Sequence, residues 1–451
     1  MSSAAAPPAH QASSNTSVLA GISTELDRFA PRIDIRADQV QVLEGPKEFY
    51  ETLKSKLRNA KKRIYLATLY IGKTEHELVS CIREALEKNA DLKVSILTDA
   101  LRGTREAPSP SCASLLMELA VAFPKQVEIR MYHTPNLTGL RKKYIPKRIN
   151  EGWGLQHMKL YGIDDEIILS GANLSDDYFT NRQDRYHVFS SKRVADYYSE
   201  IYHTMCRVSF LLQPQDNAQS FSLEWPSTNA SPSPLQDPKG YIKASADLFS
   251  HFIKPNATGS SEASSDTSIY PLLIILQALN NELPSLTSLL TTPLPTNSSY
   301  LFTAGYFNPH PDITASLLSA SKYGTKGTVV TASPWANGFY GSKGVSGLLP
   351  PAYTLLSRRF LQAASKYAPG GVELREWRLG TVGRPHGWTY HAKGLWLTLG
   401  SNASTEDAKP SELADLADGP SVTVIGSSNY TVRSYSLDAE VGAIVVTSNK
   451  A

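Results

Sequence analysis

Two His-x-Lys motifs, His157-Met-Lys159 and His391-Ala-Lys393, lie far apart in the chain, and the segments around them match at nearly constant spacing. Upstream of the motifs, segment 65–72 (YLATLYIG) resembles segment 300–307 (YLFTAGYF) at almost the same separation as the two histidines. A local pattern that occurs twice at a fixed interval is the mark of a structural repeat. The sequence therefore predicts two halves of similar fold.

The two copies also match downstream of the motifs, where the separation between equivalent residues is longer by about the length of one inserted loop. Asn173 corresponds to Asn429, and Asp184 corresponds to Glu440. The extra residues fall in segment 400–420, which is rich in Ser, Asp, Ala and Pro and is typical of an inserted loop. Equal intervals on both sides of a single insertion support a duplication.

Composition shifts along the chain suggest the domain boundaries. Residues 1–24 begin with a run of Ala, Ser and Pro, and we expect them to be disordered. Residues 25–213 form the predicted first half, and residues 239–451 the second. Segment 214–238 between them is rich in Pro, Ser and Asn and is predicted to be a linker.

Strand and helix patterns alternate in both halves, which favours α/β layers with a mainly parallel sheet. The predicted helices are 46–61, 75–87, 112–122, 239–253, 312–320 and 352–364. The predicted strands are 63–71, 92–97, 127–132, 300–304, 328–331 and 372–378. The most apolar stretch, 270–279, is too short to span a bilayer and is predicted to be a core helix.

Charge and cysteine content exclude some classes of protein. The 45 Lys and Arg residues nearly balance the 42 Asp and Glu residues, so no general nucleic-acid-binding coat is indicated. The three cysteines have no metal-ligand spacing, which argues against both a zinc site and a disulfide scaffold. The sequence gives no indication of oligomeric state.

The residue types around the two motifs suit chemistry at phosphorus. An imidazole can attack phosphorus, and a second imidazole can protonate the leaving oxygen. In an extended strand His157 and Lys159 point to the same face, so each motif sets an ammonium group beside an imidazole. The lysines, with Asn173 and Asn429, would stabilise the charged oxygens. Asp184 and Glu440 would orient the histidines through their second ring nitrogens, which makes a metal-free site for phosphodiester transfer.

These motifs resemble those of the phospholipase D superfamily, whose signature is His-x-Lys-x4-Asp followed by Gly or Ser and Asn. The first copy fits, with Asp164 in place and Ser170-Gly171 in inverted order. The second copy has Thr398 at the position of the motif aspartate. In the superfamily that aspartate usually has a structural role near the hairpin, so its loss does not by itself remove chemistry. Segments 168–186, 336–344 and 390–396 are similar to the eukaryotic mitochondrial phosphatidylglycerophosphate synthase family, and the similarity extends from about residue 25 onward.

The resemblance implies a fold, a reaction and a location. The fold would be two pseudo-symmetric phospholipase D-like halves, each a mixed sheet flanked by helices, with one active site at their interface. The reaction would join CDP-diacylglycerol to sn-glycerol 3-phosphate through a phosphohistidine, releasing CMP. We expect His157 as nucleophile and His391 as acid and base, although a symmetric motif leaves the order open.

No metal is needed for the chemistry, and a divalent ion assisting CDP-diacylglycerol binding is left open. The location would be peripheral on the matrix face of the mitochondrial inner membrane.

Basic, small and aromatic residues near the motifs are the predicted substrate contacts. Arginine forks suit phosphate, and the basic segment 141–148 would meet glycerol 3-phosphate or anionic lipid headgroups. Segment 335–343 combines glycines with aromatic faces that would take the cytosine ring and its pyrophosphate. The predicted substrate-binding residues are Ser170, Gly171, Arg182, Arg185, Ser427, Arg433, Lys143, Lys147, Arg148, Phe339 and Tyr340.

Three other interpretations use the same residues. A nucleic-acid phosphodiesterase would show a basic groove with stacking aromatics, which a net charge of +3 does not support. A related enzyme making phosphatidylserine or cardiolipin differs only in its acceptor, which the sequence does not reveal. An inactive lipid-binding scaffold predicts a lost histidine or lysine in one motif, and none is lost.

Overall fold

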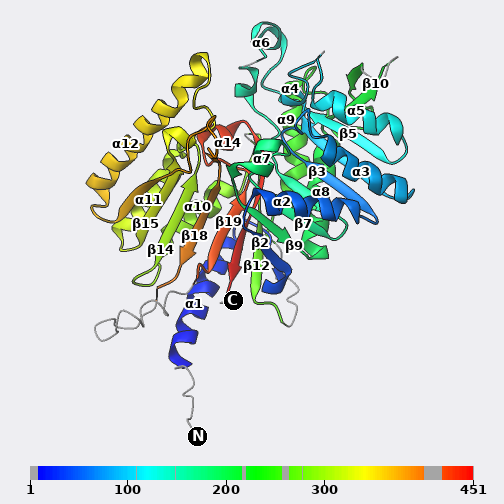
Figure 1. Cartoon of the computed structure of the whole chain (residues 1–451). Coiled ribbons are helices and arrows are strands. Elements are labelled where there is room, and N and C mark those ends of the chain that lie inside the picture. Colours follow the sequence, from blue (N-terminus) through cyan, green and yellow to red (C-terminus); the bar gives the residue numbers. More distant parts are fainter. Residues whose placement is uncertain are drawn as a thin grey trace.

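The computed structural model describes residues 9–107, 109–147, 149–215, 220–255, 264–276, 278–400 and 419–449, and in it two large sheets lie side by side with helices on their outer faces (Figure 1). Each sheet has nine strands. The strand order β5-β4-β3-β6-β7-β9 in one sheet matches β16-β15-β14-β18-β19-β20 in the other. This correspondence confirms the predicted duplication.

The first sheet and its helices are built from residues 40–224. Its strands are β2 Val40–Leu43, β3 Arg63–Ala67, β4 Lys93–Asp99, β5 Val127–Tyr132, β6 Leu160–Ile163, β7 Glu166–Ser170, β9 Tyr186–Phe189, β10 Phe210–Pro214 and β11 Phe221–Glu224. The α-helices are α2 Pro46–Arg58, α3 His76–Lys88, α4 Ala100–Gly103, α5 Cys112–Ala122, α6 Gly139–Tyr144, α7 Asp176–Thr180 and α8 Lys192–Cys206. Short 3-10 turns are η1 Ala37–Gln39 and η2 Asn150–Trp153.

The second sheet takes its strands from both ends of the chain. They are β1 Ile33–Ile35, β12 Thr267–Ile275, β13 Leu279–Asn280, β14 Ser299–Ala304, β15 Lys326–Ala332, β16 Val372–Trp377, β18 Lys393–Thr398, β19 Val422–Gly426 and β20 Ala439–Thr447. Its α-helices are α1 Ala9–Leu26, α9 Pro238–Phe249, α10 Glu282–Thr291, α11 Pro311–Lys322, α12 Leu349–Tyr367 and α14 Val432–Ser436. The 3-10 turns are η3 Ser250–Ile253, η4 Pro334–Ala336 and η5 Gly344–Leu348.

The sheets are mixed, as the superfamily resemblance implied, and less parallel than the alternation of helices and strands suggested. Only β3-β4-β5 and β14-β15-β16 run parallel, and the other neighbours in the two sheets are antiparallel. The change of direction begins at β6, which pairs antiparallel with β3, and it continues through the β6–β7 hairpin. Asp164 has a φ of 53° in the two-residue turn of that hairpin, and such a turn can join only antiparallel strands.

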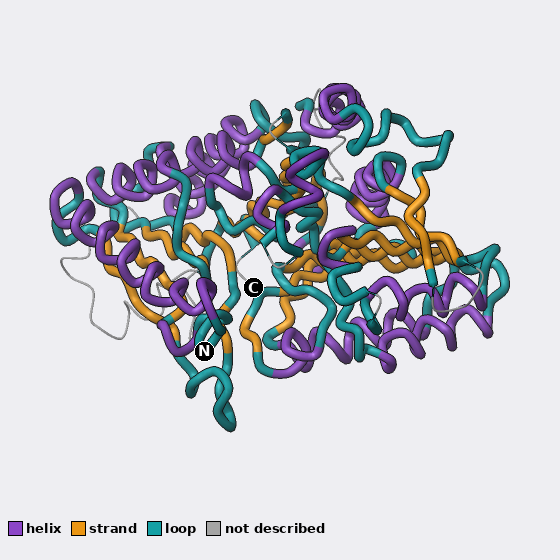
Figure 2. Tube along the Cα trace, turned by 90° about the horizontal axis from the view of Figure 1, so that it is seen from above, coloured by secondary structure: helices purple, strands orange, loops and turns teal. Residues whose placement is uncertain are grey.

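One hydrophobic core joins the two halves. Tyr198 from α8, Ile269 from β12, Ile425 from β19 and Val441 from β20 are buried in a single cluster. The Tyr198 hydroxyl donates to the carbonyl oxygen of Gly442 at 2.7 Å. In the view from above, the strands of both halves lie between layers of helix (Figure 2). The halves therefore meet through a shared interior.

The N-terminal segment is ordered from Ala9, which corrects the expected disorder of residues 1–24 for that part of them. Leu19, Ile22 and Leu26 of α1 repeat at helical spacing and are buried against the second sheet. β1 pairs antiparallel with β12 in that same sheet. Residues 25–35, assigned to the first half by sequence, thus belong in space to the second.

The predicted linker 214–238 also contains structure. β11 pairs with β10 and adds an edge strand to the first sheet. The helical prediction for 239–253 is confirmed by α9 and η3. Most of the predicted inserted loop 400–420 lies outside the described residues.

The apolar stretch 270–279 was predicted wrongly, since it is the central strand β12 and its turn. Pro271 is tolerated there because β12 has lost its outer strand neighbour at that point, between β1 and β13. The Asn281 side chain fills the gap: its amide donates to the Pro271 carbonyl at 3.0 Å, and its oxygen accepts from the Leu273 N–H at 2.7 Å. A side chain thus makes the backbone hydrogen bonds that a neighbouring strand would otherwise make, and local sequence patterns cannot reveal this.

Candidate active site

The two His-x-Lys motifs meet at the seam between the halves, and each is held by backbone from the opposite half. The His157 N–H donates to the Ala439 carbonyl at 2.8 Å. The His391 N–H donates to the Gln183 carbonyl at 2.8 Å, beside a two-stranded pairing of β17 (Thr389–Tyr390) with β8 (Arg182–Gln183). The motifs therefore occupy equivalent positions across the pseudo-twofold axis.

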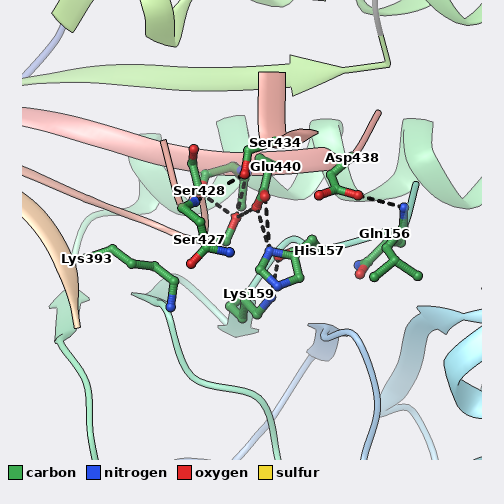
Figure 3. A network of polar contacts seen from close by, with 12 residues as sticks. Gln156, His157, Lys159, Lys393, Ser427, Ser428, Ser434, Asp438 and Glu440 are labelled. Carbon is green, nitrogen blue, oxygen red and sulfur yellow. Dashed lines mark hydrogen bonds and ion pairs between the residues drawn. The ribbon is translucent and has the colours of Figure 1, made fainter. Parts of the chain in front are cut away.

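Each histidine is oriented by a carboxylate from the opposite half. Nδ1 of His157 lies 3.0 Å from both carboxylate oxygens of Glu440 in the second half. Nδ1 of His391 lies 2.7 Å from Asp184 in the first half. The Ser427 hydroxyl donates to Glu440 at 2.5 Å and fixes that carboxylate. Figure 3 shows the His157 ring between Glu440 and Lys159. In both imidazoles Nδ1 meets the carboxylate, which leaves Nε2 as the nitrogen available for chemistry.

Both lysines are buried beside the imidazoles. Lys159 donates to the carbonyl of His157 at 2.6 Å, and Lys393 to that of His391 at 2.7 Å. The Lys393 ammonium also lies 3.9 Å from Asp184. Burial lowers the pKa of both lysines, that of Lys393 to about 8, while the nearby carboxylates work in the other direction. The negative charge of a substrate phosphate would balance the remaining positive charge of the two buried ammonium groups.

Burial shifts the pKa values of the imidazoles downward and those of their partner carboxyls upward. Burial, followed by the neighbouring lysine, lowers the pKa of both His157 and His391 well below the ordinary value. Burial raises the pKa of Glu440 to about 7 and also raises that of Asp184. A neutral imidazole has a free lone pair, so the site is set for nucleophilic attack near pH 7.

The two motif asparagines present amide oxygens to the site. Oδ1 of Asn173 and Oδ1 of Asn429 are buried and have no hydrogen-bond partner among the described residues. The Asn173 amide nitrogen donates to the Tyr178 hydroxyl at 3.0 Å. Because buried amide groups are normally paired, these two mark places where a ligand fits.

The surroundings of the two histidines differ, and sequence reasoning missed this asymmetry. The Tyr178 hydroxyl lies 3.5 Å from Nε2 of His391, and the rings of Tyr178 and Tyr306 contact that imidazole edge-on at 5.2 and 5.6 Å. Arg182 stacks over Tyr178 at 4.4 Å and pairs with Asp177 at 2.6 Å. The available signal was the alignment of the halves, in which Ser434 of the second half replaces Tyr178.

Three predicted residues of the first motif have supporting roles. Asp164, which the resemblance places among the catalytic motif residues, accepts the backbone N–H groups of 61–63 at 2.7–3.1 Å and fixes the β6–β7 turn. The Ser170 hydroxyl is used inside the loop, where it donates to the Arg185 carbonyl and accepts from the Ala172 N–H. A Cβ atom at Gly171 would collide with the Asp184 carboxylate, so glycine lets that carboxylate approach.

Arg185 was predicted to bind phosphate, but its side chain bonds to the second half and links the two halves. Its guanidinium donates to the carbonyl oxygens of Lys393 and Val424 and to the Thr423 hydroxyl, and it stacks on Trp396 at 3.8 Å. The side chain is buried and all these partners are in the second half. Arg185 therefore holds β18 and β19 in place behind the site.

Replacing Arg185 with alanine is expected to lower the free energy of unfolding by about 3 kcal/mol or more, because buried carbonyls would lose a charged donor. Urea unfolding followed by circular dichroism measures the change. Arg358→Ala on the exposed face of α12 is the matched control, with an expected change within about 0.5 kcal/mol. Equal stability of the two variants would show that Arg185 does not secure the interface.

The remaining predicted contacts lie around the mouth or outside the described residues. Arg433 donates to the Glu151 carbonyl at 3.0 Å and lies 3.3 Å from Asp438. Lys143 and Lys147 are exposed on and after α6, and Arg148 is outside the described residues. Phe339 packs on Tyr306 with ring centroids 5.5 Å apart, and Tyr340 is more exposed. Ser427 acts on Glu440 and is a positioning residue.

Two kinds of feature are absent from the described residues. No group of three or more His, Cys, Asp or Glu side chains is arranged to hold a metal ion in that part of the chain. None of its helices combines the length and apolar character needed to cross a bilayer.

The chain resembles known proteins in both sequence and fold. Residues 53–206 match the family model described as a cardiolipin synthase, phospholipase D-like domain. In fold the chain is similar to a crystal structure of phosphatidylserine synthase from Haemophilus influenzae, with a TM-score of 0.66, 19% identity, and coverage of 96% of this chain and 87% of that one.

Two named relatives define the family more closely. The CDP-diacylglycerol–glycerol-3-phosphate 3-phosphatidyltransferase of Saccharomyces pastorianus is 44% identical over 92% of this chain and 79% of its own length. The mitochondrial protein of the same name from Homo sapiens is 35% identical over 94% of this chain and 76% of its own length. The chain therefore belongs to the CDP-diacylglycerol–glycerol-3-phosphate 3-phosphatidyltransferase family, a branch of the phospholipase D superfamily.

Proposed function

We propose that this protein is a phosphatidyltransferase that converts CDP-diacylglycerol and sn-glycerol 3-phosphate into phosphatidylglycerophosphate and CMP. This would be the first step in phosphatidylglycerol and cardiolipin synthesis. The observation that carries the proposal is the pair of neutral, carboxylate-oriented imidazoles flanked by two buried lysines. The names of relatives that match more than nine-tenths of the chain support the choice of substrates.

In the first step, Nε2 of His157 attacks the phosphatidyl phosphorus and forms a P–N bond as the P–O bond to CMP breaks. CMP leaves as a phosphate monoester anion without taking a proton, so the neutral His391 keeps the lone pair on Nε2. In the second step, His391 removes the proton from a glycerol 3-phosphate hydroxyl, which attacks phosphorus and releases His157. The assignment is supported by the Tyr178 hydroxyl beside Nε2 of His391, since a hydroxyl can assist proton transfer at that nitrogen.

Lys159 and Lys393 would hold the non-bridging oxygens of the phosphoryl group as charge moves through the transition state. The unpaired amide oxygens of Asn173 and Asn429 are acceptors, so they would take hydrogen bonds from substrate hydroxyl groups rather than hold the non-bridging oxygens. Because the site supplies its own cations, the proposed chemistry requires no metal. A divalent ion bound by the substrate pyrophosphate is compatible with this scheme.

The proposed location is mitochondrial, on the matrix face of the inner membrane, with peripheral attachment to anionic lipid. The mitochondrial names of several relatives support the organelle. The lipid nature of CDP-diacylglycerol supports the membrane contact.

The decisive assay is CMP release from CDP-diacylglycerol in detergent, with and without glycerol 3-phosphate, with identification of the lipid product. We expect release that depends on this acceptor and yields phosphatidylglycerophosphate. Serine and phosphatidylglycerol serve as competing acceptors in parallel reactions. CMP release that depends on one of these acceptors instead would assign the protein to another enzyme of the superfamily. No release with any acceptor would reject the proposal that the protein is a phosphatidyltransferase.

The pH profile offers a separate prediction. We expect kcat/KM to fall as pH rises through about 8, because Lys393 then loses the proton with which it holds phosphate. In the substrate complex the phosphate charge raises the lysine pKa, so the alkaline limb of kcat should lie at higher pH than that of kcat/KM. Circular dichroism at each pH controls for unfolding. An alkaline limb of kcat/KM near 10.5 would contradict the burial argument.

A further inference from the structure

Two segments that flank the site carry exposed apolar side chains. We call residues 139–147 together with Ile149 the first lip, and residues 335–348 the second lip. Figure 1 shows α6 and the beginning of α12 projecting at the same end of the molecule, whereas α1 lies at the opposite end. The most exposed large apolar residues of the lips are Leu140 (73%), Tyr144 (69%), Ile149 (56%), Val345 (83%) and Leu348 (66%).

The same lips carry positive charge and no acidic residue. The basic side chains are Arg141, Lys142, Lys143, Lys147 and Lys343. The whole chain has a net charge of only +3, so the two lips are far more basic than the average surface. Apolar side chains interspersed with lysine and arginine are the composition that binds an anionic bilayer surface.

Both lips connect directly to the catalytic centre. The first lip continues through η2 to His157. The second lip includes Phe339, which packs on Tyr306, and Tyr306 in turn contacts the His391 ring. A lipid headgroup passing between the lips would therefore reach the imidazoles.

We propose that the two lips form a docking face for the anionic leaflet in which CDP-diacylglycerol resides. Leu140, Tyr144, Val345 and Leu348 enter the headgroup region, and the basic residues bind lipid phosphates. The inference rests on the proposed function, since it is the lipid substrate that makes access from a bilayer necessary. It assigns the occupant as a lipid surface because both the charge and the apolar exposure match that partner.

The test measures flotation of the full chain with vesicles, without substrate. One set is phosphatidylcholine alone, and the other is an equimolar mixture with phosphatidylglycerol. We expect binding to the anionic set only. Arg141→Gln with Lys142→Gln should weaken it about thirtyfold, because each basic residue near such a surface contributes about 1 kcal/mol and 1.4 kcal/mol is tenfold. Leu140→Glu with Val345→Glu should weaken it about a hundredfold or more, since insertion is lost and repulsion is added.

The control is a double variant with the same added charge on other exposed apolar residues, Val42→Glu with Tyr323→Glu. Val42 lies on β2, and Tyr323 precedes β15, at the end of that strand opposite the second lip. Their exposures are 61% and 80%, comparable with those in the lips. We expect the control to bind anionic vesicles within about twofold of the unmodified protein, because the added charges lie outside both lips.

Binding and catalysis are read separately, so the two proposals can fail independently. Leu140→Glu with Val345→Glu should keep its activity on a soluble short-chain CDP-diacylglycerol and lose it on vesicles. Equal binding by the lip and control variants would overturn the docking face. A change in oligomeric mass caused by the lip variants would also overturn it, because the lips would then cover a second copy of the chain. Loss of CMP release in the unmodified protein, with vesicle binding intact, would reject only the proposed reaction.

Discussion

His157→Ala is expected to form no covalent phosphatidyl adduct and to lower acceptor-dependent CMP release by a factor of about 10⁴ or more. His391→Ala should behave differently. CMP leaves as a phosphate monoester whose second pKa is about 6, so its departure needs little help from an acid. The glycerol hydroxyl is a much weaker acid, and its attack requires the base. His391→Ala should therefore release CMP in a burst and accumulate the adduct.

The measurement is rapid-quench detection of CMP and of labelled lipid bound to protein after denaturation. His203→Ala, on the exposed side of α8, is the control for a histidine substitution and should retain full activity. An adduct in His157→Ala, together with none in His391→Ala, would exchange the roles of the two histidines. The absence of an adduct and a burst in every variant would argue against the two-step scheme.

Glu440→Gln and Asp184→Asn are expected to lower kcat by about 10³–10⁴-fold with little change in KM. An amide that donates to Nδ1 forces the ring proton onto Nε2, so the reacting nitrogen no longer has a free lone pair. Each carboxylate orients the histidine of the opposite half, so each substitution should impair the same step as loss of that histidine. Glu440→Gln should block adduct formation, and Asp184→Asn should slow its breakdown.

The same rapid-quench experiment separates these outcomes. Ser427→Ala leaves the Glu440 carboxylate in place and removes only its hydroxyl partner, so we expect a loss of about tenfold. If Glu440→Gln instead accumulated adduct as His391→Ala does, the crossed assignment of carboxylates to histidines would be wrong. Thermal unfolding of each variant checks that the buried amides are tolerated.

Much of the site could be predicted because its chemistry lies in short motifs that occur twice. The spacing of the copies identified the histidines, lysines, asparagines and both carboxylates without any structure. Spacing could not reveal that Glu440 serves His157, since equivalence between halves does not say which half a side chain faces. Spacing also could not reveal the backbone contacts of Asp164 and Arg185, because a charged group in a motif can serve backbone atoms as readily as substrate.

The fold was predicted best where local patterns decide it. Helix 112–122 and strand 127–132 were placed correctly at both ends, since apolar periodicity governs them. Strand β12 was missed because Pro271 and a long apolar run suit several structures, and only the distant Asn281 and β20 select one. The helix α1 was missed because its three buried side chains gain their stability from the second sheet rather than from helix propensity.

The exchange of carboxylates has a consequence for the order of events during synthesis. The ribosome completes His157, Lys159 and the whole first sheet long before it reaches β20, the last strand in chain order among the described residues. Until Glu440 emerges, His157 lacks its orienting partner and the early segment α1–β1 lacks the sheet on which it packs. We therefore expect a nascent chain without β20 to be inactive.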